Sequence, residues 1–222
     1  MAEQRVRVWD WSLRVFHWTL VLLVIAMWWT AEQGYMEWHK RLGAAVVAVL
    51  VYRLIWGVIG PKSARLYTLI PLPSQFLAYL SLLKTRQYSP SFGHSPLGGL
   101  AVLALLTLLI IQTGTGLFSV DVNGLASGWF GHLISFDLGR AMADFHETSF
   151  DFLVYMIGLH LLAIITYAVL LRANLITPMI TGYQTRDEGS EPVISVTAPI
   201  LRVVIAATAA IGAAILVVSF GR

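Results

Sequence analysis

The feature that most restricts the fold of this chain is a series of apolar stretches, each long enough to cross a lipid bilayer. Crossing the hydrocarbon core takes about 20 apolar residues in a helix. Inside lipid, only helices and closed barrels satisfy every backbone polar group. The sequence therefore predicts five transmembrane helices, over residues 13–30, 39–58, 97–118, 141–171 and 201–220.

The composition is typical of a membrane protein and excludes several kinds of cofactor site and binding function. Of the residues, 57% are hydrophobic and 12% are charged, whereas soluble domains have about 45–50% apolar and about 25% charged residues. Cysteine is absent, which excludes disulfides, cysteine-ligated iron–sulfur clusters and the attachment motif of c-type haem. No basic patch of the kind that binds nucleic acid is present, so we expect no such partner. We predict an all-α membrane protein.

Two segments need separate interpretation, namely the stretch between the second and third spans and the first apolar stretch. The stretch between residues 58 and 97 contains several prolines, which argue against another span, and its piece SQFLAYLSLLK reads as an amphipathic helix at the membrane interface. The first apolar stretch is not followed by a small-residue cleavage site, so we expect it to be retained as a span. The predicted organisation is a four-helix bundle domain over residues 1–190 and an additional C-terminal transmembrane helix within residues 191–222.

The distribution of basic residues predicts the orientation. The positive-inside rule favours a cytoplasmic N-terminus. The inner face then carries Arg5, Arg7, Arg14, Lys62, Arg65, Lys84, Arg86, Arg172 and Arg186. The outer face keeps Lys40, Arg41, Arg140 and Arg222 together with several acidic residues. We expect a multi-pass protein of the bacterial inner membrane, in contact with lipid.

Four of the six histidines fall into two pairs at matching depths of the predicted bundle. His146 and His160 lie on one face of the fourth span, and their separation corresponds to a rise of about 21 Å. Because successive spans alternate in direction, His17 pairs with His160 near the inner face and His39 pairs with His146 near the outer face. Imidazoles are rare and costly in lipid, so each one needs a partner or a metal.

The pairing fits two b-type haems, which are held by axial ligands and packing alone. Two imidazoles from different helices fill both axial positions of one iron and favour electron transfer over substrate binding. The anionic propionates need cationic partners. Arg14 and Arg53 are the inner candidates, and Lys40 and Arg41 are the outer ones. A zinc site fits less well because the two pairs lie too far apart to form one four-ligand site.

The two remaining histidines have weaker functional signals. His132 lies in the loop GWFGHLISFD and reads as an interfacial polar residue. His94 lies in FGHSPLGG just before the third span, where it can cap or contact a propionate, act as an alternative inner ligand, or belong to a quinone pocket. The region around Arg14, His94 and Arg86 is one place for such a pocket.

Several stretches of the chain resemble one known family. These are VWDWSLRVFHW, HKRLGAAVVAVLVYRLIWGVIG, FGHSPLGGLAVLALLTLLIIQTGTGLFSVD, HETSFDFLVYMIGLHLLAIITY and NLITPMITG, within residues 6–183. They resemble the bacterial cytochrome b561 and nickel–iron hydrogenase b-type cytochrome family. The resemblance implies a membrane di-haem cytochrome b built on a four-helix bundle. It also implies His17, His39, His146 and His160 as axial ligands.

The functional prediction is transmembrane electron transfer between the quinone pool and a redox partner at the outer face, such as a periplasmic cytochrome c. Whether the chain is a carrier or a quinone-linked oxidoreductase stays open. One alternative is the cytochrome b subunit of a hydrogenase or another periplasmic oxidoreductase. A second is a non-redox transporter or scaffold, although the chain shows no internal repeat. The glycines in Gly98-Gly99 and Gly114-Thr115-Gly116 allow close helix contacts and leave homo-oligomerisation open.

Overall fold

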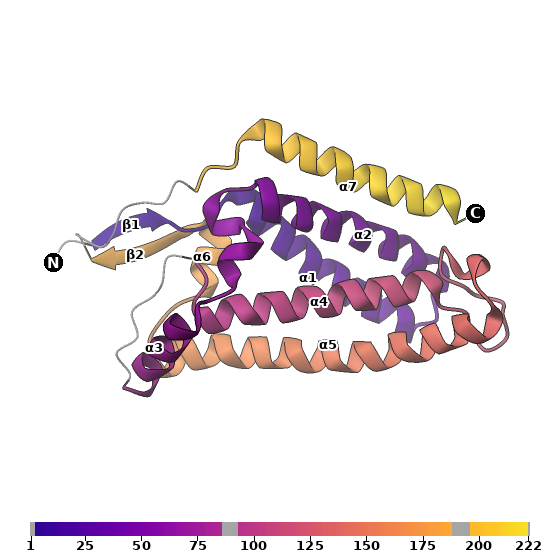
Figure 1. Ribbon diagram of the computed structural model, residues 1–222, viewed down its shortest axis with the longest axis horizontal. Helices are drawn as coiled ribbons and strands as arrows, with labels where there is room; N and C mark the ends of the chain where they lie inside the picture. The colour runs from indigo at the N-terminus through magenta and orange to yellow at the C-terminus, as the bar shows by residue number, and fades with distance from the viewer. Residues whose placement is uncertain (1–2, 86–92, 188–195, 222) are drawn as a thin grey trace. The chain divides into compact units, whose positions relative to one another are not determined.

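The computed structural model describes residues 3–85, 93–187 and 196–221, and most of them are helical (Figure 1). The elements in chain order are β1 (Glu3–Arg7), α1 (Trp11–Glu32), α2 (Met36–Ile59), the 3-10 helices η1 (Lys62–Ala64) and η2 (Leu66–Leu69), α3 (Pro73–Lys84), α4 (Pro96–Phe118), the 3-10 helix η3 (Gly131–Leu133), α5 (Phe136–Leu170), α6 (Ile176–Thr181), β2 (Tyr183–Asp187) and α7 (Ile200–Phe220).

The five predicted spans are confirmed as α1, α2, α4, α5 and α7, which are long and apolar enough to cross a membrane. The largest difference in bounds is at α5, which begins at Phe136 instead of residue 141. The reason is a polar cap, since Ser135 Oγ accepts a hydrogen bond of 3.3 Å from the backbone N–H of Leu138. The predicted boundary between residues 190 and 191 lies outside the described residues.

The amphipathic helix that the sequence indicated between the second and third spans is α3, and its position at the membrane interface stays a prediction. Proline occupies its first turn, where a missing N–H costs nothing. The side-chain oxygen of Gln75 accepts the backbone N–H of Leu72 at 3.1 Å and so satisfies one of the free donors at this end.

The predicted all-α membrane fold is confirmed, and the structure adds one short sheet that we did not predict. Strands β1 and β2 form a two-stranded antiparallel sheet, in which Glu3 pairs with Asp187 and Arg7 pairs with Tyr183. The strands are short and far apart in the sequence, so no local sequence pattern indicated that they pair. Gly182 lies between α6 and β2 and has a φ of 88°, a conformation that glycine adopts without strain. Its carbonyl accepts the N–H of Val8 at 2.9 Å.

The helices contribute to two compact units, and the unit boundaries fall inside the long helices. The first unit comprises Met1–Val15, Ile55–Ala104 and Ile157–Val203. Its core contains the fully buried pair Asp10 and Trp56. Asp10 caps α1 by accepting the N–H of Leu13 at 2.9 Å, and it accepts the indole N–H of Trp56 at 3.4 Å. Desolvation by burial raises the pKa of the Asp10 carboxyl above its ordinary value.

A second contact in the first unit holds α3 against the end of α5. The hydroxyl groups of Tyr79 and Tyr167 are hydrogen-bonded to each other. Both rings are buried with Ala173, and Leu83 and Leu175 pack around them. This cluster holds α3 against the end of α5 through buried apolar contacts and one buried hydrogen bond between the two tyrosines.

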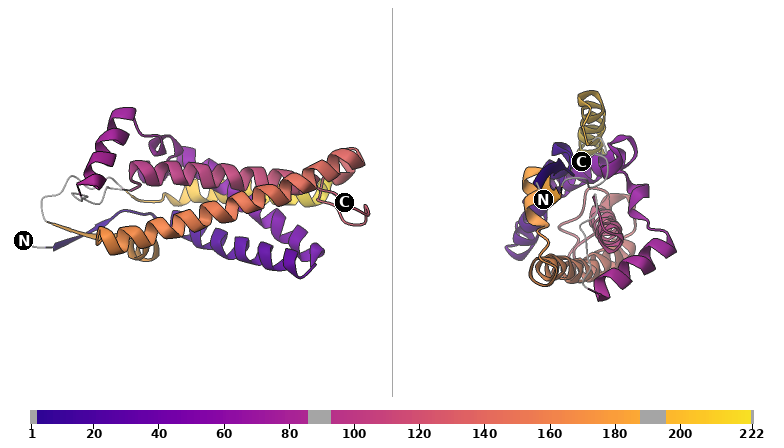
Figure 2. Two further views of the ribbon diagram at one scale, coloured as in Figure 1. Left: turned by 90° about the horizontal axis from the view of Figure 1, so that it is seen from below. Right: turned by 90° about the vertical axis from the view of Figure 1, so that its left-hand side faces the viewer.

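The second unit comprises Phe16–Leu54, Leu105–Met156 and Val204–Arg222. Within it, α4 and α5 run antiparallel and are joined by the loop over residues 119–135 (Figure 2). The indole N–H of Trp129 in this loop donates to the carbonyl of Lys40 at 2.9 Å. The end of α7 lies against the same loop, because a Cβ added at Gly221 would be 2.7 Å from the Cβ of Trp129.

Much of the exposed surface of the spans is apolar. The exposed fraction is 61% for Phe152, 57% for Leu162 and 68% for Val169, all on α5. Contiguous apolar surface of this kind is unstable in water and is matched by lipid chains. The chain is therefore a multi-pass membrane protein.

Candidate functional site

The second unit brings two of the predicted ligand histidines together. His39 comes from the first turns of α2 and His146 from α5, and their ring centroids are 6.2 Å apart with the ring planes at 88°. Both side chains are partly buried. This confirms that the two residues are neighbours on different helices, while their role as ligands stays a prediction.

Each of these imidazoles is oriented through its Nδ1 atom. The Nδ1 of His39 lies 3.0 Å from the carbonyl oxygen of Met27 in α1. The Nδ1 of His146 lies 2.8 Å from the carbonyl oxygen of Gln112 in α4. Because a carbonyl can only accept, Nδ1 must carry the proton in both rings. The lone pair of each neutral imidazole is therefore on Nε2, the atom that can ligate a metal.

Polar side chains that the sequence analysis did not single out surround His146. The side-chain nitrogen of Gln112 lies 3.2 Å from His146 Nε2 and donates to it. The Gln112 side-chain oxygen accepts the hydroxyl of Ser149, which is buried. Thr115 Oγ1 lies 3.3 Å from His146 Nδ1. Gln112 could have been recognised as a site residue from its position inside the apolar run LLIIQTG. A buried amide in such a run needs hydrogen-bond partners.

Gly116 provides the space that His146 occupies against α4. A Cβ built at this position would lie 2.7 Å from His146 Cε1 and 3.0 Å from Nδ1. A methyl group at that distance overlaps the ring, so the imidazole can rest there only because residue 116 has no side chain. The sequence analysis related this glycine to close helix contacts, and the structure adds the contact with the histidine.

The other predicted pair is divided between the two units. His17 lies on α1 in the second unit, with its ring centroid 5.1 Å from that of Trp18 in an edge-on contact. His160 lies on α5 in the first unit and is partly buried. The pairing of His17 with His160 stays a prediction.

The four cationic side chains predicted near the propionates each contact a different group. Arg53 is almost fully buried at 2% exposure, and its guanidinium is 5.9 Å from the ring centroid of Phe16. Arg14 donates from Nη1 to the carbonyl of Ile180. At the opposite end of α2, Lys40 Nζ lies 4.6 Å from the ring centroid of Trp129. Arg41 lies 5.6 Å from the ring centroid of Trp38.

The two remaining histidines lie in different segments of the chain. His94 lies against Trp9, with ring centroids 4.6 Å apart. His132 is exposed within η3, and its position at the membrane interface stays a prediction. Arg86 lies outside the described residues. The quinone pocket predicted around Arg14, His94 and Arg86 therefore stays a prediction.

Comparison with known proteins identifies the family. The family model described as prokaryotic cytochrome b561 matches residues 8–182, which include all four predicted ligand histidines and the spans α1, α2, α4 and α5. Comparisons with curated proteins and with solved structures gave no significant match. The match covers most of the chain. The chain therefore belongs to the prokaryotic cytochrome b561 family, whose members are membrane b-type cytochromes that transfer electrons.

Proposed function

We propose that this chain carries electrons across the bacterial inner membrane through two b-type haems, each held by two histidines. His39 and His146 would ligate the outer haem, and His17 and His160 the inner one. Electrons would pass between the quinone pool and a redox partner at the outer face.

The observation that carries the proposal is the arrangement of His39 and His146. Two imidazoles from different helices lie 6.2 Å apart between ring centroids with their planes nearly perpendicular, and a backbone carbonyl accepts the Nδ1 proton of each one. This hydrogen bond selects the tautomer whose Nε2 can ligate iron and raises the basicity of the ligand. The donor set thus fits a bis-histidine haem. Ligation by His146 requires the amide of Gln112 to give up its bond to Nε2.

Bound haem iron supplies reversible one-electron chemistry, and the chain sets the conditions for it. The carbonyls of Met27 and Gln112 fix the direction of the imidazoles. The apolar residues of α4 and α5 exclude water, which lowers the local dielectric and influences the reduction potential. We assign Arg14 and Arg53 as inner propionate partners and Lys40 and Arg41 as outer ones. His94 could contact a propionate or a quinone.

The charge of the two units supports the proposed orientation. In the sequence, the first unit has ten basic and five acidic residues, and the second has five basic and seven acidic residues. The first unit contains the N-terminal segment. Since basic segments stay on the cytoplasmic side, we place the N-terminus in the cytoplasm and the pair His39 and His146 toward the periplasm.

The partner at the outer face decides between two versions of this function. The matched region ends at residue 182, and α7 follows it. Its Arg202 donates to the carbonyl of Ile59 at the end of α2, with an N–O distance of 2.9 Å. A helix added to the family core is a surface on which a hydrogenase-like or other periplasmic subunit could dock. Co-purification of such a subunit would favour that version, whereas reduction of the isolated chain by a quinol would favour a quinone-linked protein acting alone.

The ligand assignment is tested by single substitutions. His39→Ala and His146→Ala should each remove one haem and leave identical reduced spectra, because both residues would hold the same iron. His17→Ala and His160→Ala should each remove the other haem. His132→Ala is the matched control and should keep both, since this histidine is exposed in a loop. If His39→Ala and His146→Ala remove different haems, the pairing is wrong.

A further inference from the structure

A small cavity lies in the first unit, at the place where α2 ends and α4 begins. Its volume is about 110 Å³, well above the roughly 10–15 Å³ that one water molecule needs, so it has room for a group with several oxygen atoms. Lys62 and Ser63 of η1 line one side, and His94 lies just before α4. Because α2 and α4 span the membrane, their ends place the cavity at the boundary between lipid and water.

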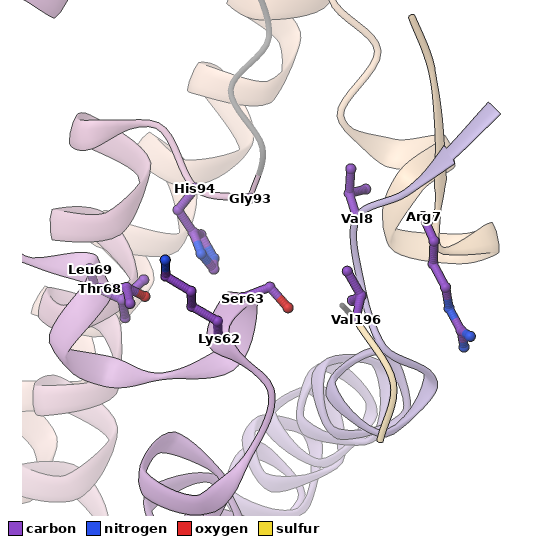
Figure 3. Close-up of a pocket in the computed structure, with 9 residues that line it drawn as sticks. All are labelled: Arg7, Val8, Lys62, Ser63, Thr68, Leu69, Gly93, His94 and Val196. Atoms are coloured by element: carbon purple, nitrogen blue, oxygen red, sulfur yellow. The ribbon is translucent and has the colours of Figure 1, made fainter. Parts of the chain in front are cut away.

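Several polar groups at this cavity can donate hydrogen bonds. The hydroxyl oxygen of Ser63 is buried and has no hydrogen-bond partner within the described part of the chain. A buried hydroxyl in this state costs free energy unless a ligand or water pairs with it. The side chains of Lys62 and His94 extend into the same space, while Arg7 points away beyond Val8 (Figure 3). The ammonium group of Lys62 adds three donors and a full positive charge.

The electrostatic field around the cavity favours an anion. Among the residues that the structure describes, none of those that line it is acidic. The first unit as a whole has twice as many basic residues as acidic ones, ten against five. Asp10 is the acidic residue closest in sequence to the lining residues Arg7 and Val8. Its side chain is fully buried and accepts a hydrogen bond from Trp56. Summed positive charge of this kind raises the local concentration of anions.

We propose that this cavity binds the phosphate group of an anionic phospholipid. Lys62 would form a charge-assisted hydrogen bond to the phosphate, and Ser63 would donate its unpaired hydroxyl. The apolar side chains of Val8, Leu69 and Val196, which also line the cavity, would contact the glycerol backbone. A lipid is favoured over a soluble phosphate because the cavity lies beside membrane-spanning helices, where basic pockets bind lipid head groups.

Lipid retention by the purified full-length chain tests this site. Native mass spectrometry would measure how much phosphatidylglycerol or phosphatidylcholine stays bound after exchange into each lipid. The change Lys62→Gln should reduce the retained phosphatidylglycerol by about tenfold, as expected for the loss of one charge-assisted hydrogen bond. The change Ser63→Ala keeps the charge and should give a smaller loss. Phosphatidylcholine, which has no net charge, should be retained poorly by every variant.

The matched control is Lys84→Gln, since Lys84 is an exposed lysine at the end of α3 that does not line the cavity. This variant should retain phosphatidylglycerol like the wild type. Equal losses in Lys62→Gln and Lys84→Gln would overturn the proposal, because they would show a diffuse charge effect. Displacement of the lipid by inorganic phosphate at equal concentration would also overturn it, in favour of a soluble anion. Neither result bears on haem ligation.

Discussion

The substitution Gly116→Ala is the sharpest structural test of the outer haem site. The added Cβ would lie 2.7 Å from His146 Cε1 and 3.0 Å from Nδ1. Non-bonded carbon atoms prefer separations of about 3.5–4.0 Å, so the imidazole must move by about 1 Å. The bond from Nδ1 to the carbonyl of Gln112 is 2.8 Å long. A shift of about 1 Å exceeds the range of a hydrogen bond, so the ring would lose its orientation.

The expected result is selective loss of the outer haem. Removing the group that orients a ligand weakens metal binding by about 10–100-fold. The purified Gly116→Ala protein should therefore contain about one haem b per chain in a pyridine haemochrome assay, where the proposed two-haem arrangement predicts two for the wild type. A redox titration followed in the visible region should lose one of its two waves.

The control for this change is Gly114→Ala, on the same helix. A Cβ at Gly114 would meet no atom within 4 Å, and both changes raise helix propensity by up to about 1 kcal/mol. Gly114→Ala should keep both haems and melt at the same temperature or higher. If Gly116→Ala keeps as much haem as Gly114→Ala, His146 does not ligate iron from the position that the structure shows.

Three further tests, which use four substitutions, address the packing of the first unit. Burial raises the pKa of Asp10, so the folded chain binds this proton more tightly than the unfolded chain. Stability therefore falls as pH rises from the ordinary carboxyl pKa toward the raised one. Asp10→Asn should remove that part of the pH dependence of the melting temperature, and parallel curves for the two proteins would refute the assignment. In a double-mutant cycle, Tyr79→Phe and Tyr167→Phe should be coupled by about 1 kcal/mol in unfolding free energy, because the two hydroxyls are paired; strictly additive losses would contradict the pairing. Arg202→Met should lower the melting temperature by removing the bond to the carbonyl of Ile59, and an unchanged melting curve would show that this bond contributes nothing.

The spans could be predicted because the membrane leaves few choices. A long apolar stretch must be helical in lipid, so α1, α2, α4, α5 and α7 followed from the sequence with bounds close to those observed. The proximity of His39 and His146 followed from alternating helix direction, which also assigns matching depths to His17 and His160. The depth of each histidine in the membrane could be derived from the sequence, because the rise per residue of a helix is fixed.

The features that the sequence did not reveal depend on which helix faces meet. Gln112 and Gly116 act on His146 only because that face of α4 lies against α5, and periodicity in a uniformly apolar helix does not distinguish one face from another. The pairing of β1 with β2 joins the first and last parts of the domain's sequence, and such long-range contacts leave no local signature. Asp10 was visible in the motif VWDW, but its bond to Trp56 required the end of α2 to be placed.

The central claim is that this chain holds two b haems, and the most direct test is to count them. The haem b of the purified wild-type protein would be quantified by the pyridine haemochrome method and divided by the protein concentration from amino-acid analysis. Our account predicts two haems per chain, each giving the low-spin spectrum of bis-histidine ligation in the oxidised and reduced states. A ratio of one or zero, or a high-spin spectrum for either haem, would contradict it.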